Sequence, residues 1–249
     1  MLTEDQVRTA VARGITFLNQ TREPHALWFM SMMHRLFRVP EFADALKRYD
    51  EVTAERPPNE AAVLRVVRRL NDVDNPLQPE DWDHVKILTD QLLICALYCD
   101  RLGFPPEFAE TLDKGVKAGG YAATHVLLAW IWLRDNGCQL AVREGFVEDM
   151  FRAVAAILED RPNMVNDLKL EAAAFLCMAR QGSRVESRFF RHVVSIQRPD
   201  GGWGQLDTPN PANPDESSWH STTLALLLLL HVAFPSAQKP DSVEHRVQP

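Results

Sequence analysis

The chain alternates between two kinds of helical segment. In the first kind, apolar residues recur at every third or fourth position, which is typical of a helix with one buried face. The second kind is apolar almost all round, as in a helix that is buried on every side. The amphipathic segments cover residues 3–20, 41–50, 59–70, 106–117, 144–159 and 185–196. The more apolar segments cover residues 25–37, 89–102, 121–133 and 167–179, with a last one after Ser217 or Ser218, and a further helix is predicted at 82–88.

This alternation repeats about six times at intervals of roughly 30 to 50 residues, which is the signature of a repeat architecture. No segment has the period-two pattern of a β-strand. We therefore predict an all-α protein, with residues 1–235 in one domain and residues 236–249 as a polar C-terminal tail. A closed ring of helical hairpins is favoured over an open solenoid, because neither end carries a polar helix that would cap a solenoid.

A polar loop precedes the most apolar helix, near the C-terminus. Asp200-Gly201-Gly202 is a turn signal within this loop, because glycine adopts positive φ without steric cost. Ser217 or Ser218 can cap the following helix by accepting a hydrogen bond from one of its free N–H groups. His220 then falls in the first turn of a buried helix, where an imidazole is costly unless it has a polar partner.

Two stretches of the chain resemble the QW repeat of squalene/hopene cyclases and protein prenyltransferases. Residues 197–203 are similar to its second half, Q-x3-G-x-W, through Gln197, Gly201 and Trp203. Residues 13–20 resemble its first half with a shortened spacer, so the two stretches cover about two of six repeats. The resemblance implies an α/α toroid, in which about six helical hairpins form a ring and the apolar inner helices surround a central cavity.

Five polar residues occupy similar positions in the apolar helices, near the first or second turn. They are His25, Asp90, His125, Glu171 and His220. In a hairpin ring all inner helices run in one direction, so these side chains would converge at one mouth of the cavity. Two or three histidines with one or two carboxylates suit Zn²⁺ or Fe²⁺. We expect the five residues to hold a divalent metal there, with Asp90 as a further ligand or as a partner of a ligand.

A competing interpretation is that each of these residues is a helix cap or a core polar group with its own partner. The positive ends of helix dipoles at this mouth would also disfavour a cation unless carboxylates offset them. The zinc site of the prenyltransferases, which consists of Asp, Cys and His, does not carry over, because the chain has no Asp-x-Cys. The DxDD motif with which related cyclases protonate their substrate is matched only by Asp72-Val-Asp74-Asn75, which lacks the last acid.

Trp28, Trp130 and Trp219 lie beside the candidate ligands on the apolar helices. They can line an apolar cavity or stabilise a carbocation through their π faces, although core packing is the commoner role. The leading hypothesis is an enzyme that acts on a mostly apolar small molecule in the central cavity, with a metal at the mouth. A metal-free acid-type cyclase is one alternative, and a non-catalytic module that binds an apolar ligand or a partner is another.

Charge and composition bear on the partners and the cellular location that we expect for this protein. A net charge of −7 without a basic stripe argues against a nucleic-acid partner. The leucine run at 226–230 is too short to cross a bilayer. The four cysteines form no CxxC pair, and three of them fall in apolar helical segments. We therefore expect buried free thiols and, from these, a cytoplasmic protein.

Overall fold

The computed structural model describes residues 2–85, 88–161, 164–204 and 217–234. Within these ranges the chain forms thirteen α-helices and three short 3₁₀ helices, and no strand. In the same ranges, one isolated antiparallel β-bridge joins Trp203 to Ser218. The prediction of an all-α protein is therefore confirmed.

The helices follow the predicted segments in order. They are α1 (Glu4–Leu18), α2 (Pro24–Phe37), α3 (Ala45–Ala54), α4 (Pro58–Val67), α5 (Pro79–Trp82), α6 (Leu88–Leu97), α7 (Cys99–Leu102), α8 (Phe108–Ala118), α9 (Gly120–Asp135), α10 (Phe146–Glu159), α11 (Asp167–Met178), α12 (Ser187–Ser195) and α13 (Trp219–Ala233). The 3₁₀ helices are η1 (Pro40–Phe42), η2 (Arg68–Leu70) and η3 (Gly182–Arg184).

Several boundaries differ from the prediction. The segment 41–50 begins as η1, and its α-helix extends to Ala54. The predicted helix 82–88 is wrong, because α5 ends at Trp82 instead of starting there. The segment 89–102 is interrupted at Tyr98, whose buried hydroxyl donates to the carbonyl oxygen of Val66 at 2.8 Å. The helical periodicity of the sequence does not reveal a tertiary contact of this kind.

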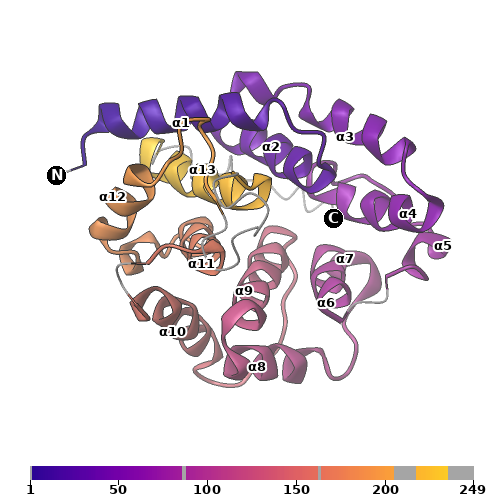
Figure 1. Ribbon diagram of the computed structural model, residues 1–249. Coiled ribbons are helices and arrows are strands. Elements are labelled where there is room, and N and C mark those ends of the chain that lie inside the picture. Colours follow the sequence, from indigo (N-terminus) through magenta and orange to yellow (C-terminus); the bar gives the residue numbers. More distant parts are fainter. Residues whose placement is uncertain (1, 86–87, 162–163, 205–216, 235–249) are drawn as a thin grey trace, which may run out of the picture.

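The helices lie in an inner and an outer layer around the molecule (Figure 1). In the inner layer α6 packs against α9, α9 against α11, α11 against α13, and α13 against α2. In the outer layer α3 packs on α2, α8 on α9, and α10 on α11. The first helix, α1, packs against the last, α13, so the two ends of the helical array meet.

Helix α13 is deeply buried along most of its length. Every residue from Leu224 to Leu230 exposes 0% of its surface, as the all-round apolar pattern predicts. Also within the core, the indole of Trp28 in α2 meets that of Trp132 in α9 edge to face, with ring centroids 5.9 Å apart. Aromatic side chains therefore fill part of the space between the inner helices.

The turn at 197–203 fastens the first helix to the last part of the chain. Gln197 donates from Nε2 to the carbonyl oxygens of Ala10 and Gly201, at 2.8 and 2.9 Å. Arg13 donates to the carbonyl oxygen of Arg198 at 2.5 Å. Gly201 has φ +93°, which confirms the positive φ predicted for this glycine pair. The residues that resemble the QW repeat thus hold α1 against the chain that leads into α13.

Trp203 continues this connection into α13. Its indole is fully buried and donates from Nε1 to the carbonyl oxygen of Val193 at 2.8 Å. Its backbone N–H donates to the Thr222 hydroxyl at 2.9 Å, and its carbonyl accepts from the backbone N–H of Ser218 at 2.8 Å. Ser218 is the residue that caps α13, by accepting from the N–H of Ser221. The start of α13, which carries His220, is thereby positioned by the turn.

Cys99 and Cys138 form a disulfide, which corrects the prediction that all the cysteines are free thiols. Packing of α6 on α9 brings the two Cα atoms within 6.2 Å, although 39 residues separate them in the sequence. Cys95 and Cys177 are free and buried, as predicted. The thiol argument for a cytoplasmic location therefore loses its basis. None of the helices in the described ranges is long and apolar enough to span a membrane.

Candidate functional site

The first turns of three inner helices meet at one end of the molecule, where their polar side chains form a connected cluster. Asp167, the first residue of α11, is the centre of this cluster. Its Oδ1 lies 2.9 Å from Nδ1 of His220 and accepts a hydrogen bond from the Ser221 hydroxyl at 2.8 Å, both from α13. Its Oδ2 accepts from the hydroxyl of Tyr121 in α9 at 3.1 Å.

Asp167 is ionised in this arrangement. Burial acts to raise the pKa of its carboxyl, but the hydrogen bond and charge of His220, with the hydroxyls of Ser221 and Tyr121, outweigh burial and lower that pKa. An ionised carboxylate can only accept hydrogen bonds, so Nδ1 of His220 must carry the proton between them. Nε2 of His220 is therefore the ring nitrogen that remains for a ligand.

His220 is held as a basic group rather than as part of a nucleophilic triad. Burial acts to lower its pKa, but the hydrogen bond and charge of Asp167, with the charge of Glu171, raise it above the ordinary value. Its side chain is 30% exposed. The Ser221 hydroxyl donates to the carboxylate and not to the imidazole, so the Ser–His–Asp order of a serine hydrolase is not formed by these residues.

Glu171 lies one turn after Asp167, and its side chain is only 5% exposed. Thr124 of α9 donates a short hydrogen bond to its Oε1, and Nδ1 of His125 lies 3.8 Å from the same oxygen. Burial raises the pKa of the Glu171 carboxyl, against the opposing effects of His125, Thr124 and His220. Nδ1 of His125 also lies 2.6 Å from the carbonyl oxygen of Tyr121, which can only accept. His125, like His220, is thus left with Nε2 for a ligand.

The two remaining candidate ligands are placed differently. His25, in the first turn of α2, is 56% exposed, and its Nδ1 lies 3.2 Å from Oε1 of Glu23. Its ring is nearly parallel to that of Trp219, at 18° and a centroid distance of 6.1 Å. Trp219 directly precedes His220, so His25 joins the rim of the cluster. Asp90 lies in the first turn of α6, but its side chain falls outside the described part of the structure.

The structure thus brings His125, Glu171 and His220 into one cluster and places His25 beside it. In the described residues, no group of three or more His, Cys, Asp and Glu side chains is arranged to hold a metal ion. The oxygens of Asp167 and the Oε1 of Glu171 already accept hydrogen bonds from hydroxyl groups. The predicted metal site therefore stays a prediction.

Of the three predicted cavity tryptophans, only Trp219 lies beside the cluster. Trp28 donates from its indole Nε1 to the carbonyl oxygen of Val67 at 2.9 Å and packs within the core. Trp130 contacts Phe146 of α10, with ring centroids 5.5 Å apart, and so packs between α9 and its outer neighbour.

Sequence reasoning missed four members of the cluster: Tyr121, Thr124, Asp167 and Ser221. Two of them carried a usable signal. Tyr121 stands four residues before His125, and Asp167 stands four residues before Glu171, so each pair shares one face of an otherwise apolar helix. A pair of polar residues at this spacing is harder to explain as a helix cap than a single one.

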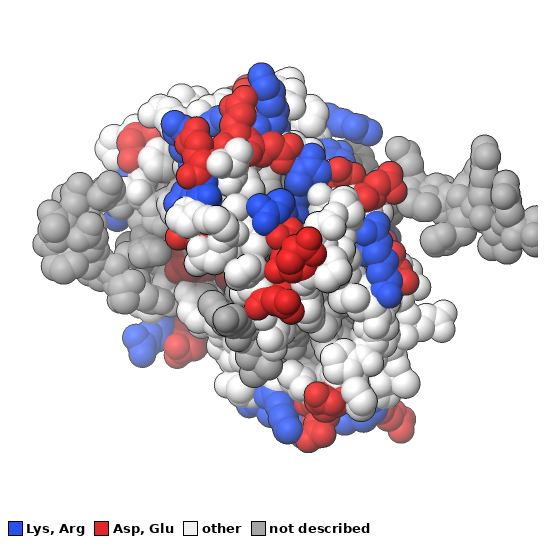
Figure 2. Space-filling model, turned by 90° about the vertical axis from the view of Figure 1, so that its right-hand side faces the viewer, with Lys and Arg blue, Asp and Glu red and all other residues white. Residues whose placement is uncertain are grey.

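The DxDD-like stretch has a structural role. Asp72 accepts a hydrogen bond from Arg68 at 2.5 Å, and Arg68 also pairs with Asp50 at 2.7 Å. Asn75 is buried and donates to the carbonyl oxygen of Arg65 at 2.9 Å. These contacts brace the connector between α4 and α5. On the face of the molecule shown in Figure 2, acidic and basic side chains are interspersed.

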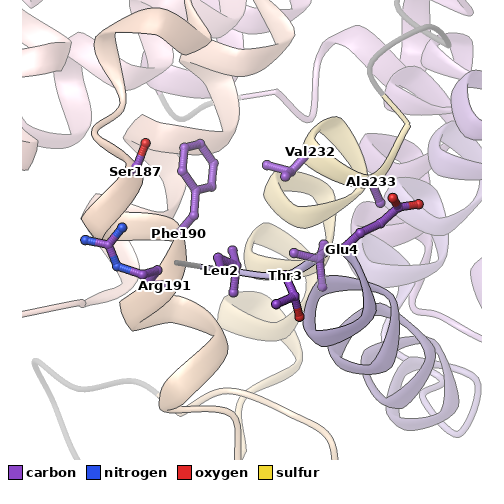
Figure 3. A pocket seen from close by; sticks show the side chains of 9 residues that line it. Leu2, Thr3, Glu4, Ser187, Phe190, Arg191, Val232 and Ala233 are labelled. Atoms are coloured by element: carbon purple, nitrogen blue, oxygen red, sulfur yellow. The ribbon is translucent and has the colours of Figure 1, made fainter.

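A groove of about 570 Å³ lies elsewhere, between α1, α12 and the end of α13 (Figure 3). Its walls include Leu2, Val7, Phe190 and Val232. Its acidic residue, Glu4, is paired with Arg8 at 2.7 Å. None of the predicted site residues lines this groove, and its lining contains no histidine, so we place the candidate site at the cluster instead.

Comparison of the chain with protein-family models, curated proteins and solved structures finds no match. The similarity to cyclases and prenyltransferases therefore rests on residues 13–20 and 197–203 alone. Any function must be argued from the geometry of the cluster.

Proposed function

We propose that the protein is a small-molecule enzyme that transfers protons by general acid–base catalysis at His220. The observation that carries this proposal is the 2.9 Å contact between His220 Nδ1 and the buried Asp167 carboxylate. Such a contact fixes the tautomer and orientation of the imidazole and directs its basicity to Nε2. Asp167 would position the imidazole, and Ser221 and Tyr121 would hold Asp167.

Glu171 supplies a candidate acid for the same reaction. Its raised pKa favours the protonated form, which can donate a proton, whereas Asp167 on the same helix is kept ionised. Two carboxyl groups whose pKa values are driven apart by their surroundings are a common basis for separate acid and base roles. Here Glu171 would act as the acid, and the ionised Asp167 would support His220 as the base.

We further propose that the helical array is a closed α/α toroid with this site at one mouth. The packing of α1 on α13 and the succession of inner helices support a closed ring. Apolar residues of the inner helices below the cluster would contact a mostly apolar substrate, as predicted for the cavity.

The test is a comparison of metabolite turnover by the wild type and two variants, His220→Gln and Asp167→Asn. Each protein is incubated with a mixed small-molecule extract, and consumption is followed by mass spectrometry. We expect compounds consumed by the wild type to be consumed about 100-fold more slowly by His220→Gln, the usual scale for loss of a catalytic base. His84→Gln, at an exposed position that is not a member of the cluster, is the control. Equal turnover by His220→Gln, or no turnover by the wild type, would contradict the proposal.

A divalent metal at this mouth is a second candidate, favoured by one specific observation. Both His125 and His220 have Nδ1 next to an oxygen acceptor, as metal-ligating histidines usually do, and this leaves Nε2 for a cation. Elemental analysis of the purified protein tests this, with His125→Ala and His220→Ala expected to lose bound metal while staying folded. A metal-free protein that carries an apolar compound and shows no turnover would instead support the non-catalytic binding module.

A further inference from the structure

We infer that the ligand of this site carries an uncharged planar ring with one N–H or O–H group, bound against the side chains of His25, Trp219 and Tyr121. We call these three residues the aromatic rim. The inference rests on the proposed function, because it assumes that His220 acts on the bound molecule. It adds the chemical class of that molecule.

The aromatic rim comes from three helices, and each of its members contacts either His220 itself or a residue that His220 contacts. Trp219 stands edge to face with His220, with ring centroids 5.3 Å apart, and His25 lies nearly parallel to Trp219. Tyr121 donates a hydrogen bond to the Asp167 carboxylate that holds His220. The imidazole of His220, whose Nε2 is left for a ligand, is therefore linked to all three rings: directly to Trp219, through Trp219 to His25, and through Asp167 to Tyr121.

These rings are solvent-accessible. Tyr121 is 46% exposed, and the His25 side chain is 56% exposed. The other strongly exposed large apolar residues of the described chain are aliphatic and lie elsewhere, in the last turns of α2, α7 and α13 and in the connector before α5. Exposed apolar surface beside a polar group often marks a binding site. At this mouth that surface is aromatic, and aromatic faces prefer stacked or edge-on rings.

Charge at the mouth selects against a cationic ligand. Clusters of aromatic side chains commonly bind cations. Here, however, two of the rings, those of His25 and His220, are imidazoles, and a protonated imidazole repels a cation. The first turns of α9, α11 and α13 present the positive ends of helix dipoles. Of the two carboxylates beside the aromatic rim, Asp167 already accepts three hydrogen bonds from protein groups, and Oε1 of Glu23 lies 3.2 Å from Nδ1 of His25. A neutral ring meets none of this repulsion.

The hydrogen bonds that Asp167 and Glu171 already accept from the protein also limit how polar the ligand can be. Asp167 and the Oε1 of Glu171 are occupied by protein donors, so they offer little to a molecule with many hydroxyl groups, such as a sugar. Nε2 of His220 remains as an acceptor for one donor. A planar ring with one N–H or O–H group satisfies both the rim and this nitrogen.

Binding of matched probes to the intact 249-residue chain tests the inference. The probes are 2-naphthol, its saturated counterpart decahydro-2-naphthol, methyl glucoside and tetramethylammonium, measured by calorimetry and ligand-detected NMR. We expect 2-naphthol to bind about tenfold more tightly than the saturated alcohol, the scale of one favourable aromatic contact. Trp219→Leu and, separately, the exposed Tyr121→Ala should each remove most of this preference. Trp82→Leu, in α5 away from the rim, should keep it.

Equal affinity for 2-naphthol and its saturated counterpart, or tighter binding of the glucoside or the cation, would overturn the inference. An unchanged preference in both rim variants would also overturn it, and the use of two variants allows for one that fails to fold. The proposed function fails separately, if His220→Gln keeps full turnover. If turnover depends on His220 but the substrate has no planar ring, the proposed function stands and this inference falls.

Discussion

Nδ1 of His220 and Oδ1 of Asp167 lie 2.9 Å apart, although 53 residues separate them in the sequence. The contact exists because α11 and α13 pack side by side and begin at the same end of the molecule. Asn166 caps α11 and Ser218 caps α13, so each residue stands at a defined place in a first turn. Two helix caps and one helix–helix interface therefore determine the geometry of the candidate base.

The turn that leads to α13 should be sensitive at Gly201. A Cβ at this position would lie 2.5 Å from the carbonyl oxygen of Arg13, and φ is +93°. Gly201→Ala should lower the free energy of unfolding by about 1–3 kcal/mol from strain alone, and further through the contact with Arg13. Gly103→Ala is the matched control, because Gly103 has φ +68° with nothing within 4 Å of its Cβ position. Urea denaturation of both variants measures the difference, and equal losses would contradict the close approach of Arg13.

The Cys99–Cys138 disulfide should stabilise the folded protein. Closing a loop between residues 39 positions apart restricts the unfolded chain, which corresponds to about 4 kcal/mol in the chain-entropy description. Reduction should therefore lower the melting temperature of the wild type. The double variant Cys99→Ala/Cys138→Ala should melt lower from the start and show no response to the reductant. An unchanged melting temperature, in protein whose thiols are shown to be free by alkylation, would refute this.

Buried His231 should make the protein lose stability in mild acid. Burial lowers the pKa of its imidazole to about 4, whereas the unfolded chain binds the proton near pH 6.5. The unfolded state therefore gains a proton first as the pH falls, and stability should drop by up to about 3 kcal/mol between pH 6.5 and 4. His231→Gln should flatten this part of the stability profile, and His84→Gln should not. The same slope in both variants would exclude His231 as the cause.

Local patterns predicted more of this protein than long-range ones did. The alternation of amphipathic and apolar segments predicted the helices, because burial on one face or on every side leaves a direct mark on the sequence. The capping box of Thr3 and Gln6 and the Ser218 cap were also predictable, since both depend on neighbours within four residues. The Cys99–Cys138 pairing was not, because it depends on which helices become neighbours.

The part of the candidate site that leaves a local mark on the sequence was predicted, and the part that depends on contacts between helices was not. His125, Glu171 and His220 stood out as polar groups in apolar helices, and the structure brings them together. Asp167 did not stand out, because an acidic residue at the start of a helix is also typical of ordinary helix termini. Its three hydrogen bonds come from two other helices, and no local pattern contains that information.

The protonation state of His220 tests the central claim most directly. Imidazole ¹⁵N NMR of the wild type across pH reports both the tautomer and the pKa without any knowledge of the substrate. We predict that neutral His220 carries its proton on Nδ1, that its pKa lies above the ordinary value of 6.5, and that Asp167→Asn lowers this pKa. The stability contributed by the pair should then be lost as the pH rises through the His220 pKa. A proton on Nε2, together with a pKa that Asp167→Asn leaves unchanged, would contradict the account.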